Sequence, residues 1–354
     1  MRCPLSPSAP CGSCSERTSH VSRRRGSLVT AFAWLIVGLG LTFAFFNGMN
    51  DSGSLAAAMI CTGAVGPRKA LLLVAASQLV GALTAGLAVA YTVGRGIVVA
   101  GAITAPVVAV ALVATIAWSV LAAVVGFPSS SSHALVGALA GAAWVQSGRQ
   151  AIIFAGVGRV LLALFIAPWV GFVVTYVLMK ALLRALAGSP PKVGARLQRA
   201  QWLLAPLVAA GHGANDGQKS MGIIALGLFA AGALQSFVVP LWVQLAAAIA
   251  LATGTTVGGT RILRTVGLKL YRMRPIHGFA SQAAAALVVV GASLLGNPVS
   301  TTQVVSASIA GAGSAQRLSQ VRWGVIVHIV MTWILTVPAA GGLAGVISWL
   351  IARH

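Results

Sequence analysis

Acidic side chains are rare in this sequence, and two of the three lie beside long apolar stretches. Asp51 ends the motif "NGMND" at 47–51 and Asp216 ends the similar "HGAND" at 212–216, whereas Glu16 lies in a polar N-terminal segment. A carboxylate in hydrocarbon is costly, so it usually faces a cavity, binds a cation or carries a proton. Either aspartate could instead cap a helix, but serine or asparagine would cap at lower cost. The repetition therefore predicts that Asp51 and Asp216 handle a cation.

A second motif also occurs twice and brings hydroxyl groups. "GFPSSSSHALVGALAGAA" at 126–143 matches "GNPVSTTQVVSASIAGAG" at 296–313. In each, a proline interrupts the chain before a row of hydroxyls and a run of small residues. A helix start has free N–H groups and a partial positive charge, so added hydroxyls can form a cradle for the oxygens of an anion. Hydroxyls also pack between membrane helices, but the second copy favours an anion. The predicted cradles are Ser130, Ser131 and Ser132, and Ser300, Thr301 and Thr302.

Anion cradles beside two aspartates create an electrostatic conflict, because like charges repel in a dry site. A cation or a proton must therefore enter with the anion, as in a symporter. The alternative is an intramembrane enzyme that uses a serine, His133 and Asp51. The second copy has Gln303 where the first has His133, and a catalytic base is not expected to have a glutamine counterpart in a symmetric site. We therefore expect no enzyme.

The elements that position these residues must be membrane helices. Hydrophobic residues make up 58% of the chain and charged residues 8%. Continuous apolar runs, from 28–46 to 324–351, are long enough to cover about 30 Å of hydrocarbon as helices. Their richness in Ala, Leu and Gly, without alternation, argues against strands. The sequence predicts an all-α, multi-pass protein of the cell membrane.

Basic residues lie mainly between the apolar runs, with 24 Lys and Arg against 3 acids. This surplus indicates topology and lipid contact, and we expect no nucleic-acid partner. The basic segments 180–200 and 261–274 are predicted to be cytoplasmic by the positive-inside tendency. Three arginines in the tail give weaker support for a cytoplasmic N-terminus.

The order of the two repeated motifs indicates a duplicated half of roughly 150 to 160 residues. We expect a disordered basic tail at 1–27, a first transmembrane repeat at 28–183, a basic connecting loop at 184–201 and a second repeat at 202–354. Duplicated halves are typical of secondary transporters, whose sites form where broken helices from both halves meet.

Taken together, the motifs resemble the inorganic phosphate transporter (PiT) family, whose members carry a G-x-N-D-like signature in each of two inverted repeats. The resemblance covers nearly all of 30–350, including "HGANDGQKSMGIIALGL" and "RLSQVRWGVIVHIVMTWILTVPAA". It implies a bacterial-type low-affinity phosphate permease with broken or half helices, roughly 10–12 helical segments in all. It also implies that the cradle hydroxyls hold phosphate, while Asn50, Asp51, Asn215 and Asp216 help to hold substrate and coupling ion.

Four positions depart from the family pattern. Ser54 replaces a common asparagine, Gln303 replaces the usual histidine, and Gln78 and Gln282 stand where sodium-coupled members usually have glutamates. An amide can ligate sodium but cannot neutralise it, so the two changes at Gln78 and Gln282 favour protons. Lys219 could pair with Asp216 or attract the anion. Further candidate site residues are Gln218, His133 and Gln303.

Some alternatives stay open from the sequence alone. A permease for sulfate or another tetrahedral oxyanion would use the same cradles, and a sodium-coupled phosphate symporter would use the same aspartates. A homodimer is compatible with the sequence. We expect no cofactor and no bound metal.

Overall fold

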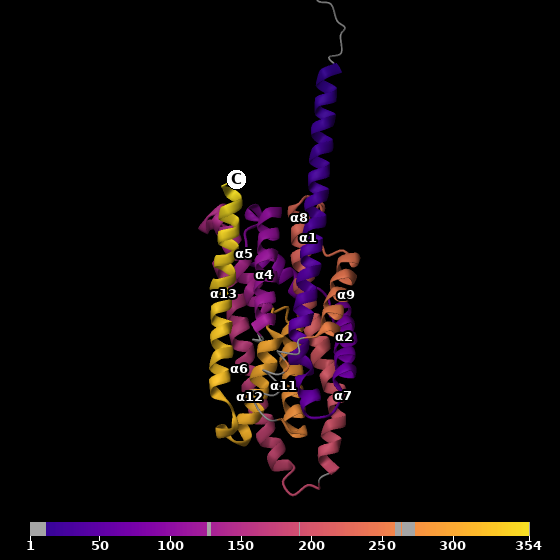
Figure 1. Ribbon diagram of the computed structural model, residues 1–354, viewed down its shortest axis with the longest axis vertical. Helices are drawn as coiled ribbons and strands as arrows, with labels where there is room; N and C mark the ends of the chain where they lie inside the picture. The colour runs from indigo at the N-terminus through magenta and orange to yellow at the C-terminus, as the bar shows by residue number, and fades with distance from the viewer. Residues whose placement is uncertain (1–11, 126–128, 191, 259–262, 264–272, 354) are drawn as a thin grey trace, which may run out of the picture.

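The protein is all-α, as the sequence predicts. The computed structural model describes residues 12–125, 129–190, 192–258, 263 and 273–353, and within these ranges there is no strand, only an isolated bridge between Val98 and Ile152. Figure 1 shows the helices as a bundle aligned roughly along the long axis. The α-helices are α1 (Gly12–Cys61), α2 (Pro67–Thr84), α3 (Ala88–Gly96), α4 (Ala105–Val125), α5 (Ser131–Ser147), α6 (Phe154–Ala185), α7 (Lys192–His212), α8 (Gln218–Ala230), α9 (Leu241–Val257), α11 (Pro275–Leu294), α12 (Thr301–Gln316) and α13 (Trp323–Ala352).

Five of these helices are long and apolar enough to cross a membrane: the Val29–Cys61 part of α1, and α4, α6, α11 and α13. α2 and α3 form a sixth candidate, with a 73° bend between them. By contrast, α5 has 17 residues and α12 has 16, so at 1.5 Å per residue each is only about 24–26 Å long. Short helices of this kind can end near the middle of a bilayer.

Prolines and one π-helical turn interrupt the regular hydrogen bonding of several helices. Pro168, Pro206 and Pro338 lie inside α6, α7 and α13, where each removes a backbone hydrogen bond. The residues Gly213–Gly217 form a π-helical turn between α7 and α8, a feature that often marks functional positions. This turn contains Asp216. α1, however, continues as an α-helix through Asp51.

Glycines allow helices from the two halves to approach closely, and they do so in matched pairs. A Cβ at Gly48 in α1 would collide with the carbonyl of Leu251 in α9, and one at Gly213 would collide with the carbonyl of Gln78 in α2. Gly48 and Gly213 are the second residues of the two aspartate motifs. The contact of α1 with α9 therefore matches the contact that the end of α7 makes with α2.

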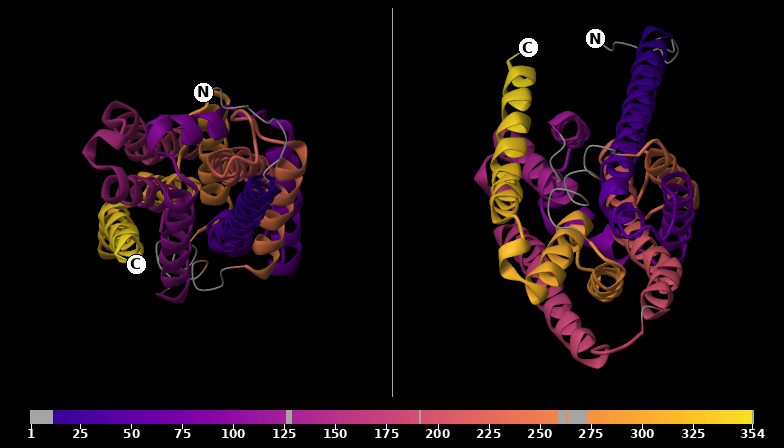
Figure 2. Two further views of the ribbon diagram at one scale, coloured as in Figure 1. Left: turned by 90° about the horizontal axis from the view of Figure 1, so that it is seen from above. Right: turned by 60° about the horizontal axis from the view of Figure 1, so that its bottom comes forward.

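The helices that carry the hydroxyl motifs also contact helices from the other half of the chain. Gly141 of α5 lies against the backbone of Gly341 in α13, and Gly311 of α12 lies against that of Phe172 in α6. Each short helix therefore packs on a long helix from the other half of the chain. Figure 2 shows α13 on the side of the molecule opposite α2 and α9.

Two expected boundaries differ from the structure. α1 begins at Gly12, within the tail expected to be disordered, because a helix nucleated in the apolar segment needs little more to extend; residues 1–11 lie outside the described part. The connecting loop is shorter than 184–201, since α6 continues to Ala185 and α7 begins at Lys192. Leu, Arg, Gln and Ala, which favour helix, fill much of that segment.

The α6–α7 connection and the N-terminal end of α1 lie at opposite ends of the molecule (Figure 1). The positive-inside tendency can therefore hold for only one of these two basic segments. Most of the other basic segment, 261–274, lies outside the described residues.

Candidate functional site

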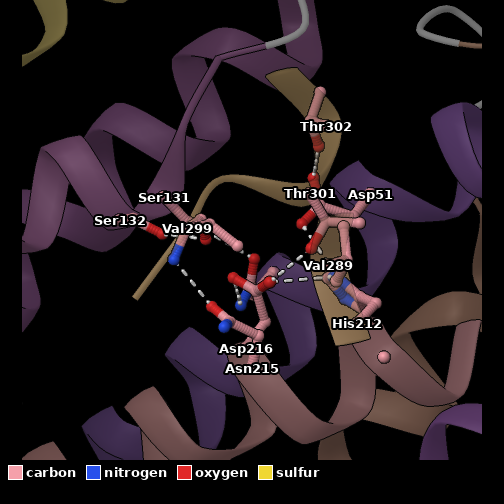
Figure 3. A network of polar contacts seen from close by, with 12 residues as sticks. Asp51, Ser131, Ser132, His212, Asn215, Asp216, Val289, Val299, Thr301 and Thr302 are labelled. Carbon is pink, nitrogen blue, oxygen red and sulfur yellow. Dashed lines mark hydrogen bonds and ion pairs between the residues drawn. The ribbon is translucent and has the colours of Figure 1, made fainter. Parts of the chain in front are cut away.

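The two repeated motifs meet in one buried cluster (Figure 3). α1 contributes Asp51, the π-helical turn contributes Asp216, and α5 and α12 contribute their first turns. Both helix starts carry the hydroxyl residues, as the sequence predicts; Pro128, however, lies outside the described residues. Asp51 is 5% exposed and Asp216 is 1% exposed. The cluster is therefore enclosed by protein.

Asp216 has several partners. Its Oδ1 accepts a hydrogen bond from Nζ of Lys219 at 2.9 Å and a long one from Nδ2 of Asn47 at 3.5 Å. Its Oδ2 accepts one from Oγ1 of Thr301 at 3.0 Å and lies 3.1 Å from Nδ1 of His212. A buried carboxylate needs such compensation for its lost hydration.

Asp51 has fewer partners. Its Oδ1 accepts a short hydrogen bond from the hydroxyl of Thr302, and its Oδ2 lies 3.7 Å from Nδ1 of His212. His212 thus stands between the two carboxylates. Among the described residues, neither ring nitrogen of His212 has a partner with hydrogen-bond geometry.

The first cradle is bonded to protein groups. Oγ of Ser130 accepts a hydrogen bond from the backbone N–H of His133 at 3.2 Å and so caps α5. Ser131 donates to Oδ1 of Asn47 at 2.8 Å. Ser132 donates to the carbonyl of Val299 at 3.3 Å. Since Val299 immediately precedes the second cradle, the two helix starts face each other.

The second cradle is bonded to the aspartates. Thr301 donates to Asp216 and Thr302 donates to Asp51, while Ser300 is the buried N-cap residue of α12 and makes no capping bond through its side chain. The hydrogen bonds predicted for an anion are thus made to carboxylate oxygens. An anion can take these hydroxyls only if the carboxylates release them.

His133 and Gln303, which occupy matching positions, lie together. Nδ1 of His133 is 2.7 Å from Oγ of Ser130 and 3.3 Å from Nε2 of Gln303. The imidazole also meets the ring of Phe165 edge to face, with centroids 5.4 Å apart. These two residues join the first turns of α5 and α12.

The amides of the aspartate motifs hold neighbouring backbone. Asn50 donates to the carbonyl of Ser119 in α4 at 3.0 Å. Asn215 donates to Oγ of Ser293 and to the carbonyl of Asn297, and its Oδ1 accepts the N–H of Val299, each at 3.0 Å. Asn215 thereby fixes the chain that leads into the second cradle.

Gln218 performs a similar role at α3. Its Oε1 accepts hydrogen bonds from the first backbone N–H groups of that helix, at 2.9 Å from Val89 and 3.4 Å from Ala90. It therefore binds protein rather than facing the aspartates.

The two glutamines predicted to adjoin the coupling ion lie in different surroundings. Gln78 accepts a hydrogen bond from Thr255 at 2.6 Å. Gln282 lines a small cavity with Ser54, and its amide has no hydrogen-bond partner among the described residues. Gly213 contacts the carbonyl of Gln78, and Gly48, at the matching position, contacts the carbonyl of Leu251. The residue that corresponds to Gln78 in the other half is therefore Leu251 and not Gln282.

Two site residues are absent from the sequence-based predictions: His212 and Asn47, each four positions before its aspartate. A signal was present, because residues four apart on a helix share a face. Asp51, His212 and Asp216 each offer one ligand atom within 4.8 Å of the others. Such a group can carry a proton or take a cation.

Comparison with known proteins identifies the family of this chain. Residues 47–198 and residues 185–344 each match the Phosphate transporter family. The chain belongs to this family. A probable low-affinity inorganic phosphate transporter of Rhizobium meliloti is 39% identical over 311 residues, covering 86% of this chain and 93% of that relative. One of Bacillus subtilis is 37% identical over 321 residues, covering 90% and 96%.

A solved structure described as the sodium-dependent phosphate transporter shares the fold of this family member. Its TM-score is 0.83 at 23% identity, with 91% of this chain and 99% of that one covered. Together with the apolar helices, these similarities identify a multi-pass membrane protein.

Proposed function

We propose that this protein imports inorganic phosphate by symport with a cation, and that the coupling ion is a proton. The observation that carries the proposal is the pair of hydrogen bonds from Thr301 to Asp216 and from Thr302 to Asp51. Each aspartate occupies a hydroxyl that an incoming oxyanion would use.

Competition for these hydroxyls couples the two solutes. Phosphate brings negative charge into a buried site and also needs the donors that the carboxylates hold. A proton on a carboxylate removes its repulsion of the anion. It also weakens the hydrogen bond between the carboxyl group and the threonine hydroxyl, because a neutral acceptor makes a weaker hydrogen bond than an ionised one. Proton and anion therefore bind better together than either does alone.

The group around His212 supports a proton as the coupling ion. Its imidazole nitrogen lies within 4 Å of both carboxylates, so a proton can be shared without a hydration shell to replace. The amides Gln78 and Gln282 add no negative charge that would offset sodium. The structural neighbour is named as sodium-dependent, and sodium is accordingly the alternative in the test.

We further propose that the two halves are inverted repeats with the substrate held between them. The exchanged glycine contacts of the aspartate motifs and of the hydroxyl helices support this arrangement. So does the approach of Ser132 to Val299, which brings the two helix starts together. Phosphate would then contact Ser131, Ser132, Thr301 and Thr302 from both halves.

Labelled phosphate uptake into proteoliposomes, with proton and sodium gradients imposed separately, tests the proposal. We expect accumulation driven by an acidic exterior in choline medium and its collapse with a protonophore. Uptake that requires sodium at every pH and survives the protonophore would contradict proton coupling but retain phosphate symport. Because low pH also shifts phosphate to its monoanion, the replacement of sodium decides between these outcomes.

The anion is tested by counterflow. Labelled phosphate inside the vesicles should exchange for external phosphate and not for sulfate. Equal exchange for sulfate would show a general oxyanion permease.

A further inference from the structure

The ammonium group of Lys219 is enclosed in a complete shell of oxygens. Its Nζ lies 2.5 Å from Oγ of Ser132, 2.5 Å from the carbonyl of Val299 and 2.9 Å from Oδ1 of Asp216. The residue is 1% exposed. An ammonium has three N–H donors and no acceptor, so all its donors are used.

This saturation argues against Lys219 as a ligand for phosphate. A phosphate oxygen could bind Nζ only by displacing one of the three oxygens. One of them is the carboxylate of Asp216, and breaking a buried ion pair is expensive. The geometry is instead that of a cation held by the protein.

The three oxygens are also of the types that transporters use for small cations. They are a carboxylate in a π-helical turn, a hydroxyl at the start of α5 and a carbonyl in the non-helical chain between α11 and α12. Carbonyls of unwound segments at broken helices commonly coordinate coupling ions in such proteins. Removing the lysine side chain would leave this oxygen set intact.

The first aspartate motif lacks the fixed cation. Ser54 stands three residues after Asp51, as Lys219 stands three residues after Asp216. Thr302, the counterpart of Ser132, donates a hydrogen bond to Asp51, whereas Ser132 accepts one from the ammonium of Lys219. Oγ of Ser54 has no hydrogen-bond partner among the described residues.

We propose that Lys219 is a tethered cation that permanently fills a monovalent cation site formed by Asp216, Ser132 and Val299. The matching position at Asp51 is left for the mobile coupling ion. This inference deepens the proposed symport and depends on it for its functional meaning.

Charge balance gives the consequence. Two carboxylates and one ammonium leave one negative charge in the phosphate-free cluster when His212 is neutral, so one mobile cation neutralises the cluster before phosphate enters. Without the lysine, two mobile cations are required. The residue would therefore set how many ions accompany each phosphate.

Replacement of Lys219 by serine, the residue at the matching position, tests the proposal. The unfolding temperature of the purified full-length protein is measured in choline chloride and in sodium chloride at equal ionic strength, without phosphate. For Lys219→Ser, sodium should raise the unfolding temperature by at least about 3 °C more than it does for the wild type, since binding to the folded state stabilises it. Labelled sodium should bind with one additional ion per protein.

The matched control is the double variant Asp216→Asn/Lys219→Ser, which removes the carboxylate as well. It should respond to sodium as the wild type does, because Asp51 is unchanged. An equal response in Lys219→Ser and the wild type, or failure of Lys219→Ser to fold in sodium buffer, would overturn the proposal. Weaker phosphate binding without an added sodium response would overturn it in favour of a substrate contact.

These measurements contain no phosphate, so their result is independent of the proposed transport. If the protein fails to accumulate phosphate, Lys219→Ser can still gain a sodium site. If the protein does accumulate phosphate, Lys219→Ser can still fail to gain one.

Discussion

Asp51 and Asp216 occupy matching positions in two copies of one motif, but their surroundings differ. Asp216 is bonded to Lys219, Thr301 and Asn47 and lies in a π-helical turn. Asp51 lies in a continuous helix, and Thr302 supplies its hydrogen bond. The two motifs are alike in sequence, but only the second has a buried ammonium three residues after its aspartate.

This difference suggests a division of labour. Protonating a carboxylate that is paired with a buried ammonium breaks an ion pair, whereas a carboxylate that has only a hydroxyl partner and a neighbouring histidine can change its charge state at lower cost. We therefore expect Asp51 to carry the coupling ion and Asp216 to organise the site.

The largest effects are expected from Asp51→Asn and Asp216→Asn. Each should lower gradient-driven phosphate uptake by roughly 100-fold or more, because Asp51→Asn removes the carboxylate expected to carry the coupling ion and Asp216→Asn removes the partner of the Lys219 ammonium. Uptake into proteoliposomes is the measurement. Normal accumulation by either variant, with unchanged pH dependence, would exclude that aspartate from coupling.

Stability should separate the same two variants. Asp216→Asn leaves the ammonium of Lys219 buried without its carboxylate, which costs about 3–5 kcal/mol. Asp51→Asn leaves no buried cation unpaired and should unfold near the wild-type temperature. Equal unfolding temperatures for the two variants would contradict the division of labour.

Smaller losses are expected in the cradles. Ser131→Ala and Thr301→Ala should each weaken phosphate binding by about 1.5–3 kcal/mol, the range for a hydrogen bond to a charged group. Ser306→Ala, further along α12 and without a hydrogen-bond partner among the described residues, is the control and should bind normally. Affinities of both cradle variants within about twofold of the wild type would show that these hydroxyls only pack.

The glycine contacts between the two halves predict that replacing Gly48 or Gly213 by alanine lowers the stability of the fold by a similar amount. Gly48→Ala and Gly213→Ala would each press a methyl group against a backbone carbonyl, and overpacking of this kind costs about 1–3 kcal/mol. Gly38→Ala, in α1 with nothing within 4 Å of the added atom, is the control. Thermal unfolding measures the effect, and a cost in only one half would argue against equivalent helix contacts.

The smallest effect is expected from His133→Gln. Glutamine already stands at the matching position 303 and can still bond Ser130, so the uptake rate should change by less than about threefold, under roughly 0.7 kcal/mol. A loss of tenfold or more would show that the imidazole carries a proton during transport.

Much of the site could be predicted because its chemistry conflicts with its surroundings. Aspartates and rows of hydroxyls stand out in an apolar chain, and their repetition predicted the motif pairs and a helix start at each row of hydroxyls; in the structure these helices begin at Ser131 and Thr301. His212 was not singled out from the sequence, although its spacing of four residues from Asp216 places the two side chains on one face of a helix. Its importance comes from its position between Asp51 and Asp216, which are 165 residues apart.

The sequence by itself determined the membrane helices, the duplicated motifs and the residue types at the site, because hydrophobic length and local spacing are properties of neighbouring residues. The tertiary structure decided which oxygen faces which donor. Only folding places Ser132 and the carbonyl of Val299 around Lys219, and only folding gives Thr301 and Thr302 to the two aspartates. These contacts join segments 80 or more residues apart, and such pairings depend on how helices pack rather than on any pattern along the chain.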